Sequence, residues 1–512
     1  MATPSDKLAQ SLEVLKKLQN HRELAVVKTS HLSRTHLDRL VSNGFLYRVI
    51  KGWYISTKPN EETGSTTSWY TSFWHFISEY MNSRFGNDWC LSPEQSLHIH
   101  SGNLMVPKQL LVRSPKAKNN NTELIHGTSI FDLALDIPKK NQIHQIQRIN
   151  VYSLASALVN CGEDFFSKHP IDARISLASI VDSSDILAIL LEGGHTVKAG
   201  RIAGAFRNIN NDKIADEIVS AMKSADYNIR EKDPFKEKNP VLLSNREPSP
   251  FANRIRLMWH QMRQTVIDGF PPDMGLPQEP GRYLQEVDEI YLSDAYHSLS
   301  IEGYIVTEEL IEQVRKGDWN PDGSAVDQEM KNALAARGYW QTFQKVKDCI
   351  RLVLDGENPG ELTDFKHREW YRELFAPSVI AGIIKASDLA GYRNNQVFIS
   401  NSKHRPPNKE AVRDAMPVLF DLLKEEKNYA VRAILGHFIF VFIHPFMDGN
   451  GRIARFLMNV MLSSGGFPWA VIPKEKRNEY MEALEEASVN QNISKFTEFV
   501  AEIVLESSNK QG

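Results

Sequence analysis

The chain has 512 residues, of which 42% are hydrophobic and 24% charged, and 60 Lys and Arg against 63 Asp and Glu give a formal charge of −3. This length predicts two or three domains and excludes a single small module, and the composition excludes a disordered or fibrous protein. A net charge near zero cannot reveal a polyanion partner, so any nucleic-acid surface has to be a local basic patch.

Cysteine usage and the lack of long apolar runs predict the compartment. Cys90, Cys161 and Cys349 are scattered without CxxC spacing, which favours a reducing compartment and buried thiols over a structural zinc site. The first ten residues are polar where a signal peptide is apolar, and no segment approaches the roughly 20 apolar residues of a membrane span. We therefore expect a cytoplasmic protein with no membrane partner.

Residues 1–59 predict a winged helix-turn-helix domain. Residues 7–19 and 33–43 have apolar positions at helical spacing, and residues 45–56 alternate as in a hairpin. Between residues 24 and 56, five basic residues and one acid make a positive patch typical of phosphate contact. A small helical domain with a solvated basic face is the alternative. The candidate DNA contacts are Arg34, Thr35, His36 and Arg39 in the second helix and Arg48 and Lys51 in the wing.

Residues 60–229 predict an α+β segment. Strand-like runs at 97–102, 109–114 and 148–154 are followed by helical runs at 185–194 and 213–225. His98 and His100 would share one face of a strand, but no Cys, Asp or further His lies nearby in the sequence. A hydrogen-bonded or exposed pair is therefore favoured over a metal site.

The order of features in this half resembles that of one known family. The run TSHLSRTHLDRLVSNGFLYRVIKGWYIS followed by LSPEQSLHIHSG resembles the AbiEi family of antitoxins and transcriptional regulators. The resemblance implies DNA binding, for instance to the protein's own promoter, and names no catalytic residue.

Residues 230–251 are rich in proline and charge and predict an interdomain linker. Beyond them, four stretches carry apolar residues at helical spacing, which predicts an all-α domain over residues 252–509. The stretches are residues 253–267, 283–303, 328–354 and 428–443.

One segment of this half, His-Pro-Phe-Met-Asp-Gly-Asn-Gly-Arg-Ile-Ala-Arg at 444–455, carries a catalytic pattern. A Gly-Asn-Gly turn at a helix start directs successive N–H groups toward an anion, and Arg452 and Arg455 share a helix face from which both can reach a polyphosphate. Asp448 offers the oxygen ligand that Mg²⁺ prefers, and His444 can take a proton at neutral pH. A helix cap, a turn and two solvated arginines would be the better interpretation of any one of these residues alone.

The segment matches HPFx(D/E)GNGRxxR at every position and resembles the Fic (Fido) family of nucleotidyltransferases. The resemblance implies a protein adenylyltransferase (AMPylator) that moves AMP from ATP to a Ser, Thr or Tyr hydroxyl of a target protein or of itself. It implies His444 as the catalytic base and Asp448 as ligand of Mg²⁺ or Mn²⁺. The implied phosphate ligands are Gly449, Asn450, Gly451, Arg452 and Arg455.

Three further segments acquire roles through the resemblance. Residues 392–403 correspond to a β-hairpin flap that aligns the target by strand addition, although an incidental surface hairpin is the alternative; the aligning residues are Val397, Phe398, Ile399 and Ser400. Tyr480 and Ser488 correspond to adenine and ribose contacts. Residues 298–303 match the inhibitory pattern (S/T)xxxE(G/N), in which Glu302, one turn after Ser298, would form a buried bidentate pair with Arg455 and occupy the cation that a γ-phosphate needs.

The overall hypothesis is a multidomain protein: a winged helix and α+β segment followed by an all-α Fic domain with a hairpin flap, autoinhibited by Glu302. Two enzymatic alternatives stay open: transfer of another phosphate-containing group, and removal of AMP by a water that Glu302 positions. A third, from another class, is a DNA-binding regulator whose Fic half senses nucleotide. The sequence names neither the target nor the operator, and it leaves a homo-oligomer open.

Overall fold

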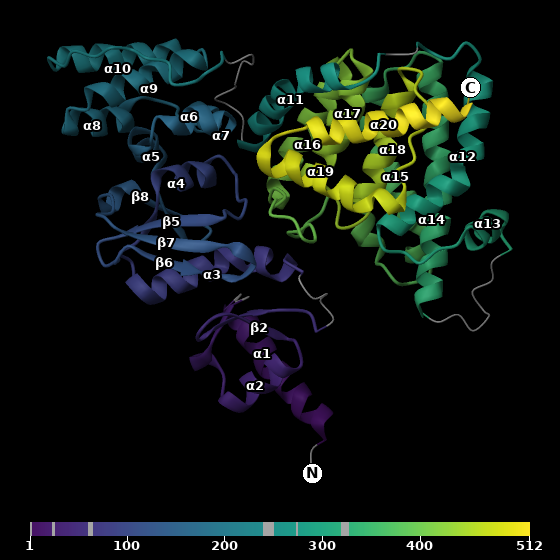
Figure 1. Cartoon of the computed structure of the whole chain (residues 1–512), viewed down its shortest axis with the longest axis horizontal. Coiled ribbons are helices and arrows are strands. Elements are labelled where there is room, and N and C mark those ends of the chain that lie inside the picture. Colours follow the sequence, from purple (N-terminus) through teal and green to yellow (C-terminus); the bar gives the residue numbers. More distant parts are fainter. Residues whose placement is uncertain are drawn as a thin grey trace. The chain divides into compact units, whose positions relative to one another are not determined.

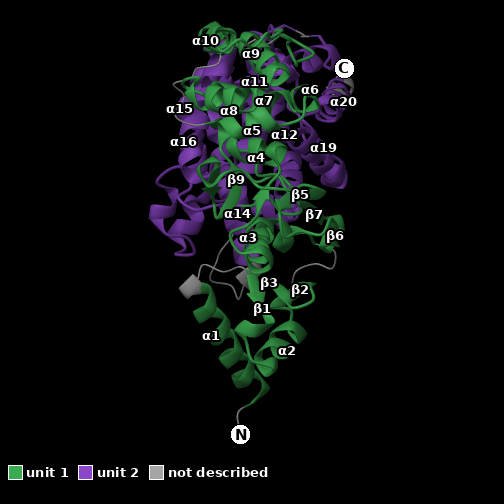
Figure 2. Ribbon diagram, turned by 90° about the vertical axis from the view of Figure 1, so that its left-hand side faces the viewer, with its two compact units in different colours: residues 1–250, 398–405 green, residues 251–397, 406–512 purple. Residues whose placement is uncertain are grey.

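The computed structural model describes residues 3–22, 26–59, 65–238, 250–272, 275–318 and 327–511. The chain forms two compact units (Figure 2): unit 1 comprises residues 1–250 with 398–405, and unit 2 comprises residues 251–397 with 406–512. None of the described helices combines the length and the apolar character needed to cross a bilayer.

Unit 1 begins with the two helices and the hairpin that the sequence predicts, together with a short strand between the helices that it does not predict. The Ser33 hydroxyl accepts the His36 N–H at 3.3 Å and caps the second helix. Gly52, at φ 84°, turns the hairpin, whose strands form an antiparallel sheet in the order β1-β3-β2. The elements are α1 (Pro4–Arg22), β1 (Val26–Lys28), η1 (Thr29–His31), α2 (Arg34–Ser42), β2 (Leu46–Ile50) and β3 (Trp53–Ser56).

The next part of unit 1 is a mixed sheet in the order β4-β5-β7-β6, with β5 parallel to β7 and a separate β8-β9 hairpin (Figure 1). Helix α3 buries an aromatic face in the same apolar cluster as Leu110 and Ile130 of the sheet. The elements are α3 (Thr67–Phe85), β4 (Cys90–Leu91), α4 (Pro93–His100), β5 (Gln109–Ser114), β6 (Asn120–Glu123), η2 (Ile125–Gly127), β7 (Ser129–Ala134), η3 (Lys140–Gln142), β8 (Ile143–Ile146) and β9 (Ile149–Tyr152).

The strand expected at residues 97–102 is wrong, because this run ends a helix and enters a turn. The Ser92 hydroxyl accepts the Gln95 N–H at 3.2 Å and Pro93 occupies the first helical turn, so α4 begins five residues before His98. A six-residue alternation is too short to separate a strand from the last turn of a buried helix. His98 and His100 therefore do not share a strand face.

Six helices complete unit 1 around a second apolar cluster. The chain after α10 packs on this cluster: Phe235 is buried, and the Lys232 N–H donates to the Gly200 carbonyl at 3.1 Å. The expected linker start at residue 230 is therefore early, and residues 239–249 of that linker lie outside the described residues. The helices are α5 (Leu154–Asn160), α6 (Asp164–Lys168), α7 (Pro170–Ala178), α8 (Ser184–Gly193), α9 (Thr196–Asn208) and α10 (Asp212–Ser224).

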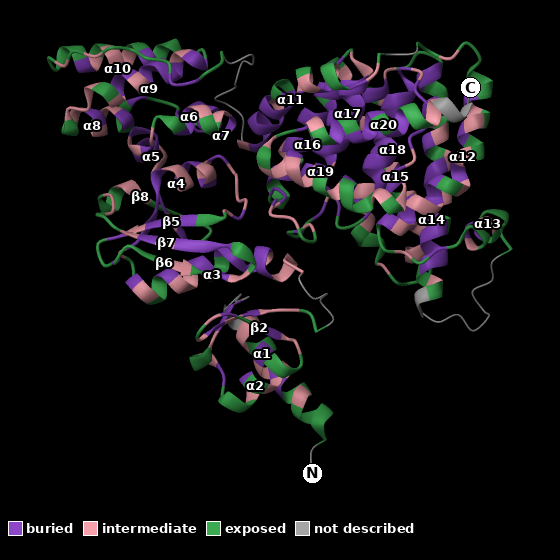
Figure 3. Cartoon of the chain, viewed as in Figure 1, coloured by how far each residue is buried: buried purple, intermediate pink, exposed green. Residues whose placement is uncertain are grey.

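Unit 2 is helical throughout its regular structure, as predicted. Helix α17 is buried along almost its whole length and packs on α18, which is why its sequence is apolar on every face (Figure 3). The elements are α11 (Pro250–Gly269), α12 (Pro280–Ile301), α13 (Glu308–Lys316), α14 (Asp327–Leu354), α15 (Pro359–Ile380), η4 (Ala386–Leu389), α16 (Lys409–Glu425), α17 (Tyr429–Ile443), α18 (Asn450–Ser463), η5 (Lys474–Lys476), α19 (Arg477–Asn490) and α20 (Ser494–Gln511).

The expected hairpin flap has no strand in this structure. Val397, Phe398, Ile399 and Ser400 form a run without a β ladder, and residues 398–405 group with unit 1, where Asn401 Oδ1 accepts the Thr66 N–H at 2.9 Å. Pro406 and Pro407 lack the N–H groups that an opposing strand would donate. The run is therefore extended chain with side-chain and carbonyl partners instead of a hairpin.

Candidate active site

The loop between α17 and α18 contains two left-handed residues. His444 follows α17 with φ 53°, and its N–H donates to the Phe440 carbonyl at 3.0 Å. Gly449 precedes α18 with φ 75°, and a Cβ atom there would lie 2.9 Å from the Phe375 ring. Glycine is thus required at 449 by both backbone and packing. The two turns bring the imidazole and the first turn of α18 to one end of the helix pair.

The side chain of Asn450 is turned into the loop. It is 1% exposed, its Oδ1 accepts the Phe446 N–H at 2.9 Å, and its Nδ2 donates to the Phe446 carbonyl at 2.9 Å. The Phe446 ring stacks on Tyr371 with centroids 4.0 Å apart. The Asn450 side chain therefore closes the loop on itself, and only its main-chain N–H is left to face an anion.

Arg452 and Arg455 are 1% and 3% exposed. The Arg452 guanidinium lies between the rings of Tyr304 and Phe375, 5.1 and 5.2 Å from their centroids. Within the described chain, Arg452 Nε and Nη2 and Arg455 Nη1 are buried without a hydrogen-bond partner, since Asp448 Oδ1 is 3.6 Å from Arg452 Nη2. Buried donors without acceptors are costly. These donors match an anionic ligand.

Glu302 follows α12 and lies over this end of α18. Its Oε1 accepts Arg455 Nη2–H at 2.7 Å, while Arg455 Nε donates to the Ser298 hydroxyl at 2.8 Å. A Cβ atom on Gly451 would lie 2.4 Å from Glu302 Oε1, so the carboxylate rests on the helix start. The expected buried bidentate pair is corrected: the contact uses one oxygen and the Glu302 side chain is 24% exposed, because Ser298 takes the second edge of the guanidinium.

The electrostatics at Glu302 and Arg455 follow from this contact. Burial by itself would raise the pKa of Glu302, but the charges of Arg455 and Arg452 hold that pKa below its usual range. Burial would likewise lower the pKa of Arg455, and Glu302 raises it. The pair is therefore fully ionised at neutral pH.

His444 is half-buried, and burial lowers its pKa to about 4. Its Nδ1 lies 3.3 Å from the Val441 carbonyl, which can only accept, so Nδ1 carries the proton and Nε2 carries the lone pair. A neutral imidazole with a free Nε2 lone pair can accept a proton from a hydroxyl at physiological pH.

Asp448 is the most exposed of the charged loop residues, with a 64% exposed side chain. Its Oδ1 accepts the Gly449 N–H at 2.6 Å and lies 3.6 Å from Arg452 Nη2. A solvent-exposed carboxylate beside Arg452 is an oxygen ligand of the kind that binds Mg²⁺ or Mn²⁺ together with phosphate oxygens. The residues present therefore match the divalent ion that the motif implies.

Tyr480 and Ser488, the expected adenine and ribose contacts, both lie on α19. Tyr480 is 1% exposed and its hydroxyl lies 2.8 Å from His437 Nε2, so the ring is part of the core instead of an adenine surface. An aromatic residue on the inner face of an amphipathic helix is normally core. Ser488 is half-buried.

The candidate DNA contacts in unit 1 divide into two groups. His36 Nδ1 lies 2.9 Å from the Ser11 hydroxyl, and Arg39 donates to that hydroxyl and to the Lys7 carbonyl, both at 2.8 Å. The major-groove role expected for His36 and Arg39 is therefore corrected, because α1 occupies their polar groups. Four residues remain exposed: Arg34, Thr35, Arg48 and Lys51.

His98, one of the two histidines of α4, lies close to residues that are distant from it in the sequence. His98 Nδ1 lies 2.8 Å from Asp172 Oδ2, and His169 is close enough that the three residues could share a metal ion. The premise that no Asp or further His lies nearby is wrong in space. Asp172 is nonetheless hydrogen-bonded on both oxygens, by Ser101 and by Asn103, which makes it a polar junction between α4 and α7.

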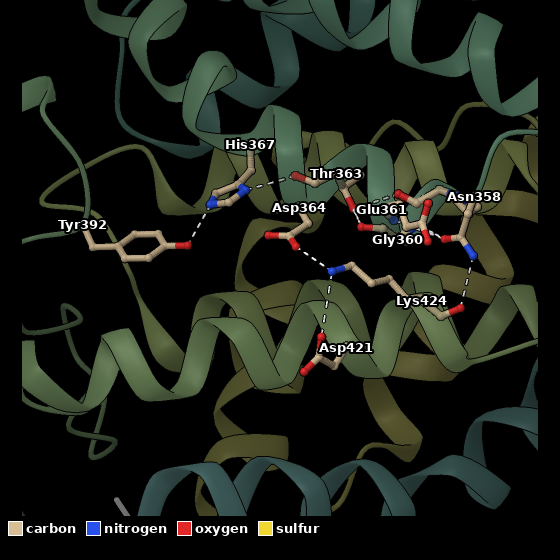
Figure 4. Close-up of polar contacts among 10 residues, drawn as sticks. Asn358, Gly360, Glu361, Thr363, Asp364, His367, Tyr392, Asp421 and Lys424 are labelled. Carbon is tan, nitrogen blue, oxygen red and sulfur yellow. Dashed lines mark hydrogen bonds and ion pairs between the residues drawn. The ribbon is translucent and has the colours of Figure 1, made fainter. Parts of the chain in front are cut away.

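His367, Tyr392 and Arg393, which the sequence analysis did not single out, contact the loop, and the first two are drawn in Figure 4. Buried His367 donates from Nδ1 to the Thr363 carbonyl at 3.0 Å, and its Nε2 accepts the Tyr392 hydroxyl at 2.9 Å. Asp364, three residues before His367 on α15, accepts a hydrogen bond from Lys424 of α16 at 2.7 Å. Arg393, next to Tyr392, donates to the His444 carbonyl. The Tyr-Arg pair that begins the expected flap, residues 392 and 393, was the available sequence signal.

Comparison with known proteins locates the similarity. Residues 367–462 match the Fic/DOC family model. The Protein adenylyltransferase Fic of Drosophila willistoni is 29% identical over 222 residues, 42% of this chain and 40% of its own length. That of Drosophila yakuba is 29% identical over 272 residues, 52% of this chain and 50% of its own. The solved structure of Fic-1 (residues 134–508) from C. elegans matches with a TM-score of 0.38 and 18% identity, covering 67% of this chain and 97% of that one.

The chain thus spans half or less of the length of these two curated relatives. Apart from residues 398–405, which group with unit 1, the family match lies in unit 2; it includes the second part of α15, the loop and α18 as far as residue 462, whereas Ser298 and Glu302 lie outside it.

Proposed function

We propose that this chain is a protein adenylyltransferase that transfers AMP from ATP to a Ser, Thr or Tyr hydroxyl of a target protein, itself included. The observation that carries the proposal is the set of buried, unpartnered guanidinium donors of Arg452 and Arg455 beside a neutral His444. The curated relatives, which are named protein adenylyltransferases, support the same assignment.

In the proposed reaction His444 Nε2 accepts the proton of the target hydroxyl, whose oxygen bonds to the α-phosphorus of ATP. The bond from that phosphorus to the bridging oxygen breaks, and pyrophosphate leaves. Arg452, Arg455 and the N–H groups at the start of α18 hold the phosphate charge in a water-poor site. When bound, Mg²⁺ or Mn²⁺ on Asp448 would neutralise charge on the phosphate oxygens.

We propose that Glu302 restrains this activity. Its carboxylate uses the Arg455 Nη2 donor and covers Gly451, which is where a phosphate would approach the helix start. Nucleotide that binds without displacing Glu302 would hold its γ-phosphate away from Arg455. The resting enzyme would then bind ATP in a non-productive pose.

The test of the reaction compares ATP labelled at the α- and the γ-phosphate, with Mg²⁺, in the Glu302→Gly protein. Protein-bound label is expected from the α-position only, together with an AMP adduct by mass spectrometry. Label from the γ-position, or an adduct other than AMP, would replace the proposal with transfer of another group. Release of AMP from a pre-modified target that requires Glu302 but no pyrophosphate would favour hydrolytic removal of AMP.

A second candidate function, DNA binding by the first helical module of unit 1, is favoured by its exposed cations. Arg48 and Lys51 lie on the β2–β3 hairpin, and Arg34 is 94% exposed at the start of α2. We expect the Arg48→Ala, Lys51→Ala double variant to weaken binding to a promoter-region duplex and to lower the salt slope by about 2, one per phosphate contact. Lys118→Ala, an exposed lysine elsewhere in unit 1, is the matched control, and equal binding by all three proteins would refute this function.

A further inference from the structure

Arg393 is a buried cation without a carboxylate partner in the described part of the chain. It is 2% exposed and makes no ion pair there, and burial lowers its pKa to about 10. Buried charges are normally paired with an opposite charge, because desolvation is costly. The N–H donors of Arg393 bind main-chain carbonyls instead, so its role depends on where those carbonyls lie.

The carbonyls that Arg393 binds come from three separate places. Its Nε donates to the His444 carbonyl at 2.8 Å, Nη1 to the Asn395 carbonyl at 3.0 Å, and Nη2 to the Pro407 carbonyl. Its own N–H donates to the Pro445 carbonyl at 2.9 Å. Arg393 therefore joins the end of α17 to both ends of the segment 395–407. We call these two ends, residues 395–396 and 406–407, the neck of the segment.

A second side chain closes the same neck. Gln396 Nε2 donates to the Pro406 carbonyl at 3.0 Å, one residue inside the Arg393 contacts. Tyr392, next to Arg393, is hydrogen-bonded to His367 of α15 (Figure 4). The Tyr392 ring also lies 5.7 Å from that of Phe446 in the loop. The neck is thereby fixed to α15 and to the loop at once.

We propose that Arg393 is a positioning residue that fixes the base His444 at the end of α17 by joining it to residues 395 and 407. This inference rests on the proposed function. A planar guanidinium with five donors can bind three diverging carbonyls at one time, whereas a Lys ammonium is a compact charge on a flexible stem. Arg393→Lys keeps the charge and loses the three-way geometry.

The consequence for catalysis is a change in kcat without a change in ATP binding, because none of the three carbonyls belongs to the nucleotide site. A misplacement of about 1 Å between reacting groups can cost about 100-fold in rate. We expect Arg393→Lys to lower kcat by about this factor and to leave the KM for ATP within about 3-fold. Arg393→Gln should lose at least as much.

The matched control is Arg413, an exposed arginine that binds the same stretch through the Asn394 side chain at 2.8 Å. In a Glu302→Gly background, Arg413→Lys should keep kcat within about 3-fold. A kcat for Arg393→Lys equal to that of Arg413→Lys would overturn the inference, as would a loss expressed only in KM.

Hydrogen exchange gives a readout that does not depend on activity. In Arg393→Lys, amides of residues 394–405 and of residues 440–446 should exchange faster together, since both ends lose the same anchor. Faster exchange in only one of the two segments would overturn the inference. If Arg393→Lys does not fold, Gln396→Ala, which removes only the inner contact, replaces it with the same criteria. Absence of AMP transfer in the Glu302→Gly parent would refute the proposed function and leave the exchange result decisive.

Discussion

Removal of the Glu302 carboxylate should release the proposed transferase. The contact to displace is one ion-paired hydrogen bond of 2.7 Å between Glu302 Oε1 and Arg455 Nη2, on a side chain that is 24% exposed. Hydrogen bonds to charged groups contribute about 1.5–3 kcal/mol, so if ATP must break this one to reach its productive pose, Glu302→Gly should raise the rate about 10- to 150-fold. Glu302→Gln keeps the shape without the charge and should give an intermediate increase.

The assay is the initial rate of AMP incorporation from α-labelled ATP, with the parent, both Glu302 variants and Glu308→Gln. Glu308 is exposed at the start of the neighbouring α13, so its neutralisation controls for a general loss of negative charge. Rates in the order Gly, Gln, parent are expected, with Glu308→Gln equal to the parent. A Glu302→Gly rate no higher than that of the parent would refute the restraint.

Three further outcomes follow from the same geometry. Arg452→Lys should raise the KM for ATP about 10-fold or more in steady-state kinetics, because it removes Nε and Nη2 donors that no described residue satisfies, and an unchanged KM would contradict the phosphate role. Because burial lowers the pKa of His444 to about 4, the base is unprotonated above that pH; the acid limb of kcat/KM should lie near pH 4–5, and a limb at about 6.5 would contradict a buried neutral base. Burial lowers the pKa of His437 to about 3, so below pH 6.5 the unfolded chain binds a proton that the folded chain does not, and the free energy of unfolding should fall by about 1.4 kcal/mol per pH unit. In urea unfolding, the free energy of His437→Gln should fall less steeply with decreasing pH than that of the parent. An identical pH dependence would refute the claim that His437 is buried in its neutral form.

The sequence predicted the features that depend on local order. The helices of unit 2 follow from apolar spacing, and the loop follows from a helix that ends at His444 and another that begins after Gly449. Proximity along the chain guarantees that these two ends meet. The same holds for α2 and its hairpin, whose cap and turn residues are adjacent in sequence.

Features that depend on distant partners could not be predicted. His36 and Arg39 bind α1 because Ser11 faces them across the module. His98 contacts Asp172, 74 positions later in the chain, and no residue spacing in the sequence predicts this contact. Side-chain satisfaction is a tertiary property, and motif positions specify residue type without specifying partner.

The central claim is that His444 deprotonates the hydroxyl that attacks ATP at this loop. His444→Asn tests it most directly, because Asn tolerates the left-handed backbone at φ 53° that Ala would strain, and it cannot accept the proton. In the Glu302→Gly background, α-labelled ATP should modify protein with His444 present, and His444→Asn should abolish the label while nucleotide binding and thermal unfolding stay unchanged. Undiminished labelling by the folded His444→Asn protein would contradict the account.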